Sequence, residues 1–131
     1  MSYKKSVNLD KHTEQDGSLV PLEFEDVPFI PKRIFYVKNV PIKTERGGHA
    51  HFKTKQFLIC VKGIIVVKLH DGFDETEHTL QEDEGIYIPS LIWDSQIFMT
   101  GSDILLSLCS TNYDEKDYID NFNKFKAIRS N

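Results

Sequence analysis

Two histidines, His49 and His51, lie one residue apart in the glycine-containing stretch 46–51. Imidazole is the side chain best suited to exchanging protons near neutral pH, and it is also a common metal ligand. In an extended strand, residues two positions apart point to the same face. The spacing therefore predicts that both imidazoles share one pocket, where they could bind a metal ion or transfer protons.

The length and charge of the chain limit the kind of protein it can be. At 131 residues it fits one domain, residues 1–131, with a single hydrophobic core. The formal net charge of −4 gives no overall positive field for nucleic acid or an anionic membrane. No apolar run approaches the roughly 20 residues that cross a bilayer, and the first residues lack the apolar core of a signal peptide. We therefore expect a cytoplasmic protein.

Short β-rich runs separated by turn residues make up most of the chain. Many short strands and few helices favour a β-sandwich or a small barrel. The runs on either side of Lys62 and Gly63 are predicted to pair as a hairpin. The expected strands are Ser6–Leu9, Leu19–Phe24, Arg33–Val37, His49–Phe52, Gln56–Val61, Ile64–His70, Glu77–Leu80, Gly85–Ile88, Ile92–Phe98 and Ile104–Ser110.

The C-terminal segment is predicted to form one short helix against the β body. Asp114 can cap the start of this helix, and Tyr118, Phe122 and Phe125 recur at helical spacing. An aromatic stripe of this kind is typical of a packing face rather than of a ligand site.

The spacing around the histidines resembles the first motif of the cupins. Counting back from Gly63, six residues separate it from Gln56, four separate Gln56 from His51, and one separates the two histidines. Downstream, residues 85–89 and then Trp93 and Asp94 resemble the second cupin motif. The resemblance implies an all-β fold: a small cupin-type β-barrel, or jelly roll, with a short C-terminal helix.

Metal-binding cupins use two histidines, an acidic residue and a further histidine, and this chain departs from that set. Gln56 and Asp94 occupy the last two positions. Gln56 is a neutral and weak ligand, although Asp94 could complete a set of two imidazoles and one carboxylate suited to non-haem iron. The donor types favour a pocket without a metal or other cofactor, and a metal-dependent cupin oxygenase is the alternative.

A longer set of strings resembles the sugar-nucleotide 3,4-ketoisomerases, which act on dTDP-4-keto-6-deoxyglucose. The strings are Lys-Arg-Ile-Phe-Tyr at 32–36, Arg-Gly-Gly-His-Ala-His at 46–51, the run 56–63, Tyr-Ile-Pro at 87–89 with Trp93, and the run 113–119. The resemblance implies a metal-independent isomerase that moves a ketone from carbon 4 to carbon 3. It also implies a homodimer with exchanged N-terminal strands. The product would enter the synthesis of 3-amino sugars for surface glycans such as the O-antigen of lipopolysaccharide.

This reaction needs groups that carry protons, and the chain supplies them. The proton on carbon 3 must be removed, an enediol formed, and a proton returned to carbon 4. An imidazole with a pKa near the working pH suits this task. We assign His51 as the carbon base and His49 as a relay between the oxygens, and we expect Tyr36 to donate a hydrogen bond to the enediolate.

Other residues are expected to bind the nucleotide and the sugar. Arginine forks suit a pyrophosphate, which makes Arg33 and Arg46 the candidates, with Lys53 behind them. Trp93 is expected to form a wall of the sugar pocket. Gln56 is expected to bond to a sugar hydroxyl or to an imidazole.

Two acidic residues depart from the family pattern. Asp16 precedes the Gly-Ser-Leu turn, where relatives commonly carry a basic residue, and Asp94 follows Trp93, where they carry His or Arg. We expect these positions to bear on which face of the enediol is protonated, so the configuration at carbon 4 stays open. Asp94 could alternatively accept the second N–H of a histidine and raise its basicity. The acidic replacements also leave open a non-catalytic module that binds sugar nucleotides.

Overall fold

A computed structural model describes all 131 residues as two facing antiparallel sheets with a short C-terminal helix. One sheet has the order β1-β9-β6-β11-β4 and the other has the order β12-β5-β10-β7-β8. The bounds are β1 Ser6–Asn8, β2 His12–Glu14, β3 Gly17–Leu19, β4 Arg33–Val37, β5 Thr44–His51, β6 Gln56–Lys62, β7 Ile65–His70, β8 Glu75–Leu80, β9 Glu84–Ile88, β10 Trp93–Phe98, β11 Ile104–Cys109, β12 Tyr118–Ile119 and α1 Phe122–Ser130.

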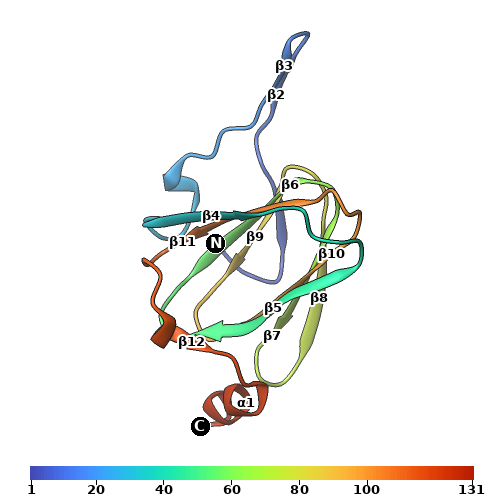
Figure 1. The fold of residues 1–131 in the computed structure, drawn as a ribbon. Helices are drawn as coiled ribbons and strands as arrows, with labels where there is room; N and C mark the ends of the chain where they lie inside the picture. Colours follow the sequence, from blue (N-terminus) through green and yellow to red (C-terminus); the bar gives the residue numbers. More distant parts are fainter.

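The core lies between the two sheets, as in a jelly roll of the cupin type (Figure 1). Leu58 and Leu105 of one sheet join Val67 and Phe98 of the other in one buried cluster. Strand β7 alternates buried and half-buried residues, which is the pattern of a strand with one face in a core. The predicted all-β fold with a C-terminal helix is confirmed.

The predicted hairpin across Lys62 and Gly63 is wrong. Strands β6 and β7 are consecutive but belong to different sheets, so the turn carries the chain across the core. Gly63 has a φ of +89°, and a Cβ there would overlap Oδ1 of Asp103. The first five residues of β6 are all buried, which is typical of a central strand covered on both faces rather than of a solvated hairpin.

The N-terminal region differs from the prediction at one strand. Residues 20–24 are not a strand; instead β2 and β3 form a short hairpin, and a 3-10 turn follows at Phe24–Asp26. The hairpin projects from the top of the body in Figure 1, and every residue of both strands is exposed. Within one chain, its apolar Leu19 therefore has no core to join.

The C-terminal helix begins later than the sequence predicted. Asp114 does cap a helical turn, but it is the 3-10 turn Glu115–Asp117, where its carboxylate accepts from the backbone N–H of Lys116. Strand β12 follows, and α1 begins only after Asn121, whose side chain accepts from the N–H of Lys124. Tyr118 therefore lies in a strand that pairs with β5 and not on a helix.

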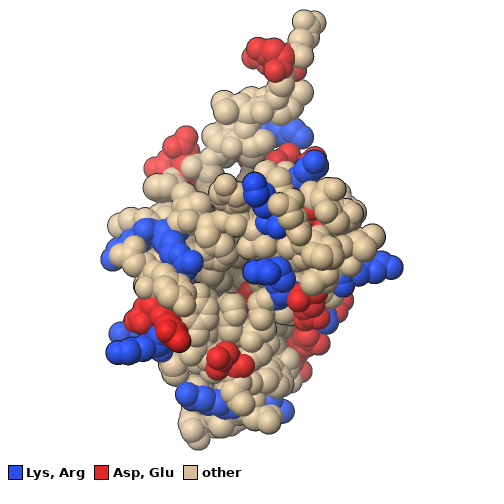
Figure 2. All heavy atoms as spheres, in the orientation of Figure 1, with Lys and Arg blue, Asp and Glu red and all other residues tan.

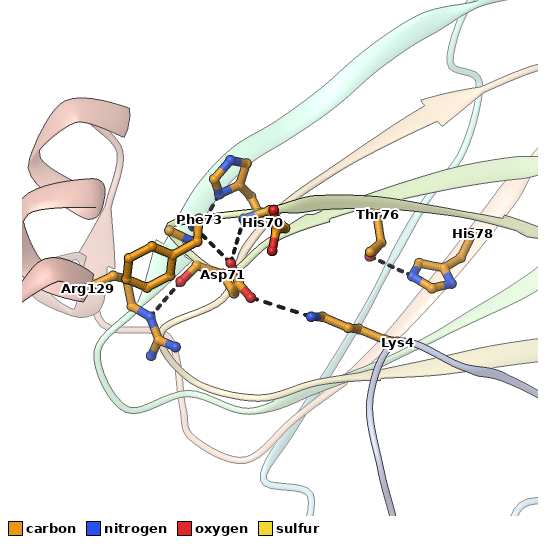
Figure 3. A network of polar contacts seen from close by, with 9 residues as sticks. Lys4, His70, Asp71, Phe73, Thr76, His78 and Arg129 are labelled. Atoms are coloured by element: carbon orange, nitrogen blue, oxygen red, sulfur yellow. Dashed lines mark hydrogen bonds and ion pairs between the residues drawn. The ribbon is translucent and has the colours of Figure 1, made fainter.

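A polar network fastens the helical end of the molecule (Figure 3). Asp71, in the turn after β7, accepts from the backbone N–H groups of Phe73 and Asp74 and pairs with Lys4 at 3.4 Å. Its backbone carbonyl accepts from Arg129 Nε at 2.8 Å. The backbone bonds and Lys4 lower the pKa of the Asp71 carboxyl to about 2. The turn thus contacts the N-terminal segment through the Asp71 side chain and α1 through its backbone carbonyl.

Basic and acidic side chains alternate over the face drawn in Figure 2, and no large basic patch forms on it. None of the helices has the length and apolar character needed to span a membrane.

Candidate active site

Strand β5 presents the two histidines side by side, as the spacing predicted. The ring centroids of His49 and His51 are 5.1 Å apart, and the rings meet nearly edge to face. His51 is 5 % exposed, while His49 is half-buried. Ala50 points the other way and is buried against Ile119 and Phe125. The alternation of the strand thus separates a chemical face from a packing face.

A bulge at Gly47 and Gly48 adds a third group to the chemical face. Without it, Arg46 and His49 would lie on opposite faces, because they are three residues apart. The pairing with β10 shifts here, so that His49 lies opposite Asp94 and Arg46 lies opposite Gln96. Asp94 and Gln96 are two residues apart on one face, and directly opposed residues share a face. The bulge therefore turns Arg46 to the same side as His49.

Both glycines have a positive φ that favours glycine, but only Gly47 also lacks room for a side chain. Gly47 and Gly48 have φ values of +87° and +84°, a conformation that side chains rarely adopt. A Cβ on Gly47 would lie 3.1 Å from both the carbonyl oxygen of Asp94 and the Cα of Ser95, whereas one on Gly48 would meet nothing within 4 Å. Close approach of β5 to β10 thus depends on Gly47.

A small cavity of about 100 Å³ opens between the sheets beside His49. Its polar lining consists of Arg46, His49, Gln56, Asp94 and Gln96. Apolar side chains from β4, β6 and β11 complete the wall. Four residues that the sequence singled out therefore meet in one place.

Burial makes both imidazoles neutral at physiological pH. It is the main cause that lowers the pKa of His51 to about 4, with further lowering from His49 and Arg33 and partial compensation from Asp117. Burial also lowers the pKa of His49, against a small opposing effect of Asp120. A neutral imidazole has a free lone pair, so each ring can accept a proton without first losing one.

Asp94 is a buried acid with one unpaired oxygen. Asp94 is 1 % exposed. Its Oδ2 accepts a hydrogen bond from Gln96 Nε2, and its Oδ1 has no hydrogen-bond partner. Burial raises the pKa of the Asp94 carboxyl to about 7, despite the opposing bond from Gln96. Asp94 makes no hydrogen bond or ion pair with either histidine, so the hypothesis that it orients an imidazole is wrong.

Tyr118 and Gln96 are site residues that the sequence did not reveal. The ring of Tyr118 lies 4.9 Å from that of His49 and 4.5 Å from that of His51, so it covers both imidazoles. Its helical spacing with Phe122 concealed this role. Gln96 lies two positions beyond Asp94, so the period of a strand was a usable signal for it.

Arg33 and Lys53 lie near the histidines but outside the small cavity. The Arg33 guanidinium stacks on Tyr113 at 5.1 Å and is close enough to lower the pKa of His51. Lys53 lines a separate polar groove of about 570 Å³, together with Lys116 and Asp117. Two basic residues are thus available on this side of the molecule for a phosphate-bearing ligand.

Three predicted site residues are not brought to the histidines within one chain. Tyr36 is 61 % exposed, because its neighbours Phe35 and Val37 take the cavity-facing positions of β4. Trp93 points to the other face of β10 and packs on Phe122 and Phe125 of α1, so it is a packing residue and not a wall of this cavity. Asp16 lies in the turn of the projecting hairpin.

The donor set does not match a cupin metal centre. The structure contains no group of three or more His, Cys, Asp or Glu side chains placed to share a metal ion. Oδ2 of Asp94 is already bonded to Gln96, and Gln56 donates its amide to Cys109 Sγ at 3.7 Å. These residues are engaged in hydrogen bonds rather than grouped around one shared ligand position.

Comparison with known proteins gives one consistent family. A family model described as WxcM-like, C-terminal (FdtA) matches residues 2–130. The chain is 36 % identical over 128 residues to a TDP-4-oxo-6-deoxy-alpha-D-glucose-3,4-oxoisomerase of Aneurinibacillus thermoaerophilus, covering 94 % of this chain and 92 % of that protein.

Solved structures agree with this match. A 3,4-ketoisomerase from Helicobacter canadensis superposes with a TM-score of 0.91 at 30 % identity, covering 97 % of both chains. The 3,4-ketoisomerase QdtA from Thermoanaerobacterium thermosaccharolyticum, a histidine-to-asparagine variant in complex with TDP-4-keto-6-deoxyglucose, has a TM-score of 0.91 at 32 % identity, covering 99 % of this chain and 96 % of that one.

Proposed function

We propose that this chain, which belongs to the WxcM-like, C-terminal (FdtA) family, is a 3,4-ketoisomerase of a dTDP-linked 4-keto-6-deoxyhexose. The observation that carries the proposal is the pair of neutral imidazoles on β5, 5.1 Å apart, of which His49 lines a small polar cavity. The family match supplies the substrate class, and the geometry supplies groups that can perform the chemistry.

The reaction is an internal redox exchange between two neighbouring carbons and consumes no oxidant. A base removes the proton on carbon 3, the electrons form an enediol, and the same proton or another is delivered to carbon 4. Neutral His51 is the base that we assign to carbon, because its ring has a free lone pair and is held in place by contacts with His49 and Tyr118. Tyr118 covers both rings and limits their motion, so the imidazole stays in position for attack.

Arginines on two strands are suited to the charged part of the substrate. Arg46 lies at the cavity beside His49, and Arg33 lies near His51. A guanidinium fork bonds phosphate oxygens in pairs, which fixes orientation as well as charge. We assign the pyrophosphate to these two arginines, with Lys53 as a further cation in the adjoining polar groove.

We also propose a homodimer in which the N-terminal hairpins are exchanged. The hairpin of β2 and β3 leaves the body of its own chain, and Leu19 is 66 % exposed. An apolar groove lies between the outer face of the β6 and β11 sheet and the chain's own segment 18–24, lined in part by Ile34, Val61 and Leu106. A second copy would bury both surfaces, and its hairpin would bring Asp16 towards a neighbouring site. Size measurement in solution tests this part directly, since a monomer at working concentration would exclude it.

The wider role that we propose is the synthesis of 3-amino-3,6-dideoxy sugars for surface glycans, in the cytoplasm. The configuration produced at carbon 4 is a separate question, because Asp16 and Asp94 replace basic residues. A metal-dependent oxygenase and a non-catalytic binding module are the competing functions.

One experiment distinguishes the three functions. The purified protein is mixed with dTDP-4-keto-6-deoxyglucose in heavy water, and the sugar is followed by proton NMR. We expect conversion to the 3-keto sugar at an unchanged rate after chelation, with the product signals reporting the configuration at carbon 4. Binding without turnover would favour the non-catalytic module. Oxygen consumption that depends on stoichiometric iron or manganese would favour the oxygenase.

A further inference from the structure

Asp94 is the one buried polar side chain whose oxygen is left without a partner in this protein. Its carboxyl lines the cavity, directly across the strand pair from His49. Opposed residues of an antiparallel pair have Cβ atoms about 4.5–5.5 Å apart. An unpaired buried oxygen costs free energy, and such a group is kept where a ligand completes its bonding.

We propose that Asp94, as a neutral carboxylic acid, carries the hydroxyl proton between oxygen 4 and oxygen 3 of the sugar, a role that rests on the proposed isomerase function. The structure determines which oxygen holds the proton. Gln96 Nε2 donates to Oδ2, so that oxygen acts as the acceptor. The proton of the neutral acid therefore resides on Oδ1, the oxygen that has no protein partner.

The reaction needs a group with these properties, because two protons must move. As His51 removes the proton on carbon 3, the Oδ1–H of Asp94 protonates the ketone oxygen on carbon 4, and a neutral enediol forms. The Asp94 carboxylate then takes the hydroxyl proton from oxygen 3, while protonated His51 returns a proton to carbon 4. The ketone is now on carbon 3, and both side chains are back in their starting states.

The histidines are poorly suited to this second task. The pKa of each imidazole is lowered, so neither is a protonated donor at neutral pH. The pKa of Asp94 is about 7, which leaves this acid partly protonated near neutrality. The titratable or charged groups that face Asp94 are His49 and Arg46 of β5; Leu69 lies opposite on β7, and Gln56 of β6 is neutral. The relay predicted for His49 is therefore reassigned to Asp94.

The variant Asp94→Asn tests the assignment, because it keeps the shape and neutrality of the acid but has no transferable proton. We expect it to bind the substrate like the wild type and to lower kcat by about 10²-fold or more, the usual size of acid–base effects. The wild-type kcat/KM should fall as the pH rises through about 7, and the residual activity of the variant should lack this limb. Wild-type turnover and an unchanged alkaline limb in the variant would overturn the proposal.

Gln96→Met gives a readout that a merely structural role would not move. The Gln96 bond lowers the pKa of Asp94, so its removal should shift the alkaline limb to higher pH. A limb that stays in place would contradict the coupling of Asp94 to catalysis.

An infrared difference spectrum tests the neutral acid without any substrate. We expect the C=O stretch of a protonated carboxylic acid in the wild type at pH 5 and its loss in Asp94→Asn. Asp103→Asn is the matched control. Burial alone would raise the pKa of Asp103, but hydrogen bonds from Thr100 and Ile64 outweigh it and lower the pKa, so that variant should keep the band. Absence of the band from the wild type refutes this inference, whereas failure of the wild type to isomerise the sugar refutes the proposed function.

Discussion

The Gly47→Ala substitution tests whether the bulge in β5 builds the site. The new alanine must adopt a φ of +87°, and its methyl group would lie 3.1 Å from two backbone atoms of β10. The backbone conformation costs about 1–3 kcal/mol. Overpacking against Asp94 and Ser95 adds about 1–3 kcal/mol more. A shift of the Asp94 backbone would also move the Asp94 carboxyl. We therefore expect kcat to fall by about tenfold to a hundredfold, because this carboxyl is misplaced.

Gly48→Ala is the matched control, because it has nearly the same φ of +84° but no atom within 4 Å of the added Cβ. It should lose only the conformational contribution, about 1–3 kcal/mol, and keep most of its activity. The free energy of unfolding is measured in urea, and the difference between the two variants isolates the contact with β10. Equal stabilities and equal rates for the two alanine variants would refute the role of Gly47.

Three further predictions concern pH and packing. The kcat/KM should fall as the pH drops through about 4, because protonation of His51 removes the base; an acid limb near 6.5 in the pH–rate profile would contradict this. The folded-state pKa of Asp94 is raised, so the wild type should lose stability relative to Asp94→Asn as the pH rises from about 4 to about 7, which melting curves at pH 5 and pH 8 would show. Phe125→Ala should cost about 3–5 kcal/mol in urea unfolding, since this fully buried ring holds α1 on Trp93; a loss below about 1 kcal/mol would contradict that packing.

The sequence predicted the elements that depend on local pattern. The alternation of strands placed His49 and His51 on one face, and the structure has them there. The turn residues and short apolar runs predicted an all-β body, because each strand carries its own alternation.

The remaining features depend on contacts between distant segments. The turn at Gly63 has the local residues of a hairpin, but it carries the chain across the core from β6 in one sheet to β7 in the other. The pairing partners of β6 and β7 lie elsewhere in the chain, so the local sequence does not show which sheet β7 joins. Tyr118 kept helical spacing with Phe122, but pairing with β5 placed it in a strand against the histidines. The side to which Arg46 points depends on a bulge that only the register with β10 reveals.

Isomerisation of the sugar in heavy water is the most direct test of the central claim, that a histidine of the β5 pair moves the carbon proton with no metal ion. The wild type should convert dTDP-4-keto-6-deoxyglucose and incorporate deuterium at carbon 4 of the product, at the same rate with and without a chelator. A variant with both His49→Asn and His51→Asn should do neither while still binding the nucleotide. Conversion at the native rate by that variant, or complete loss of wild-type turnover on chelation, would contradict the account.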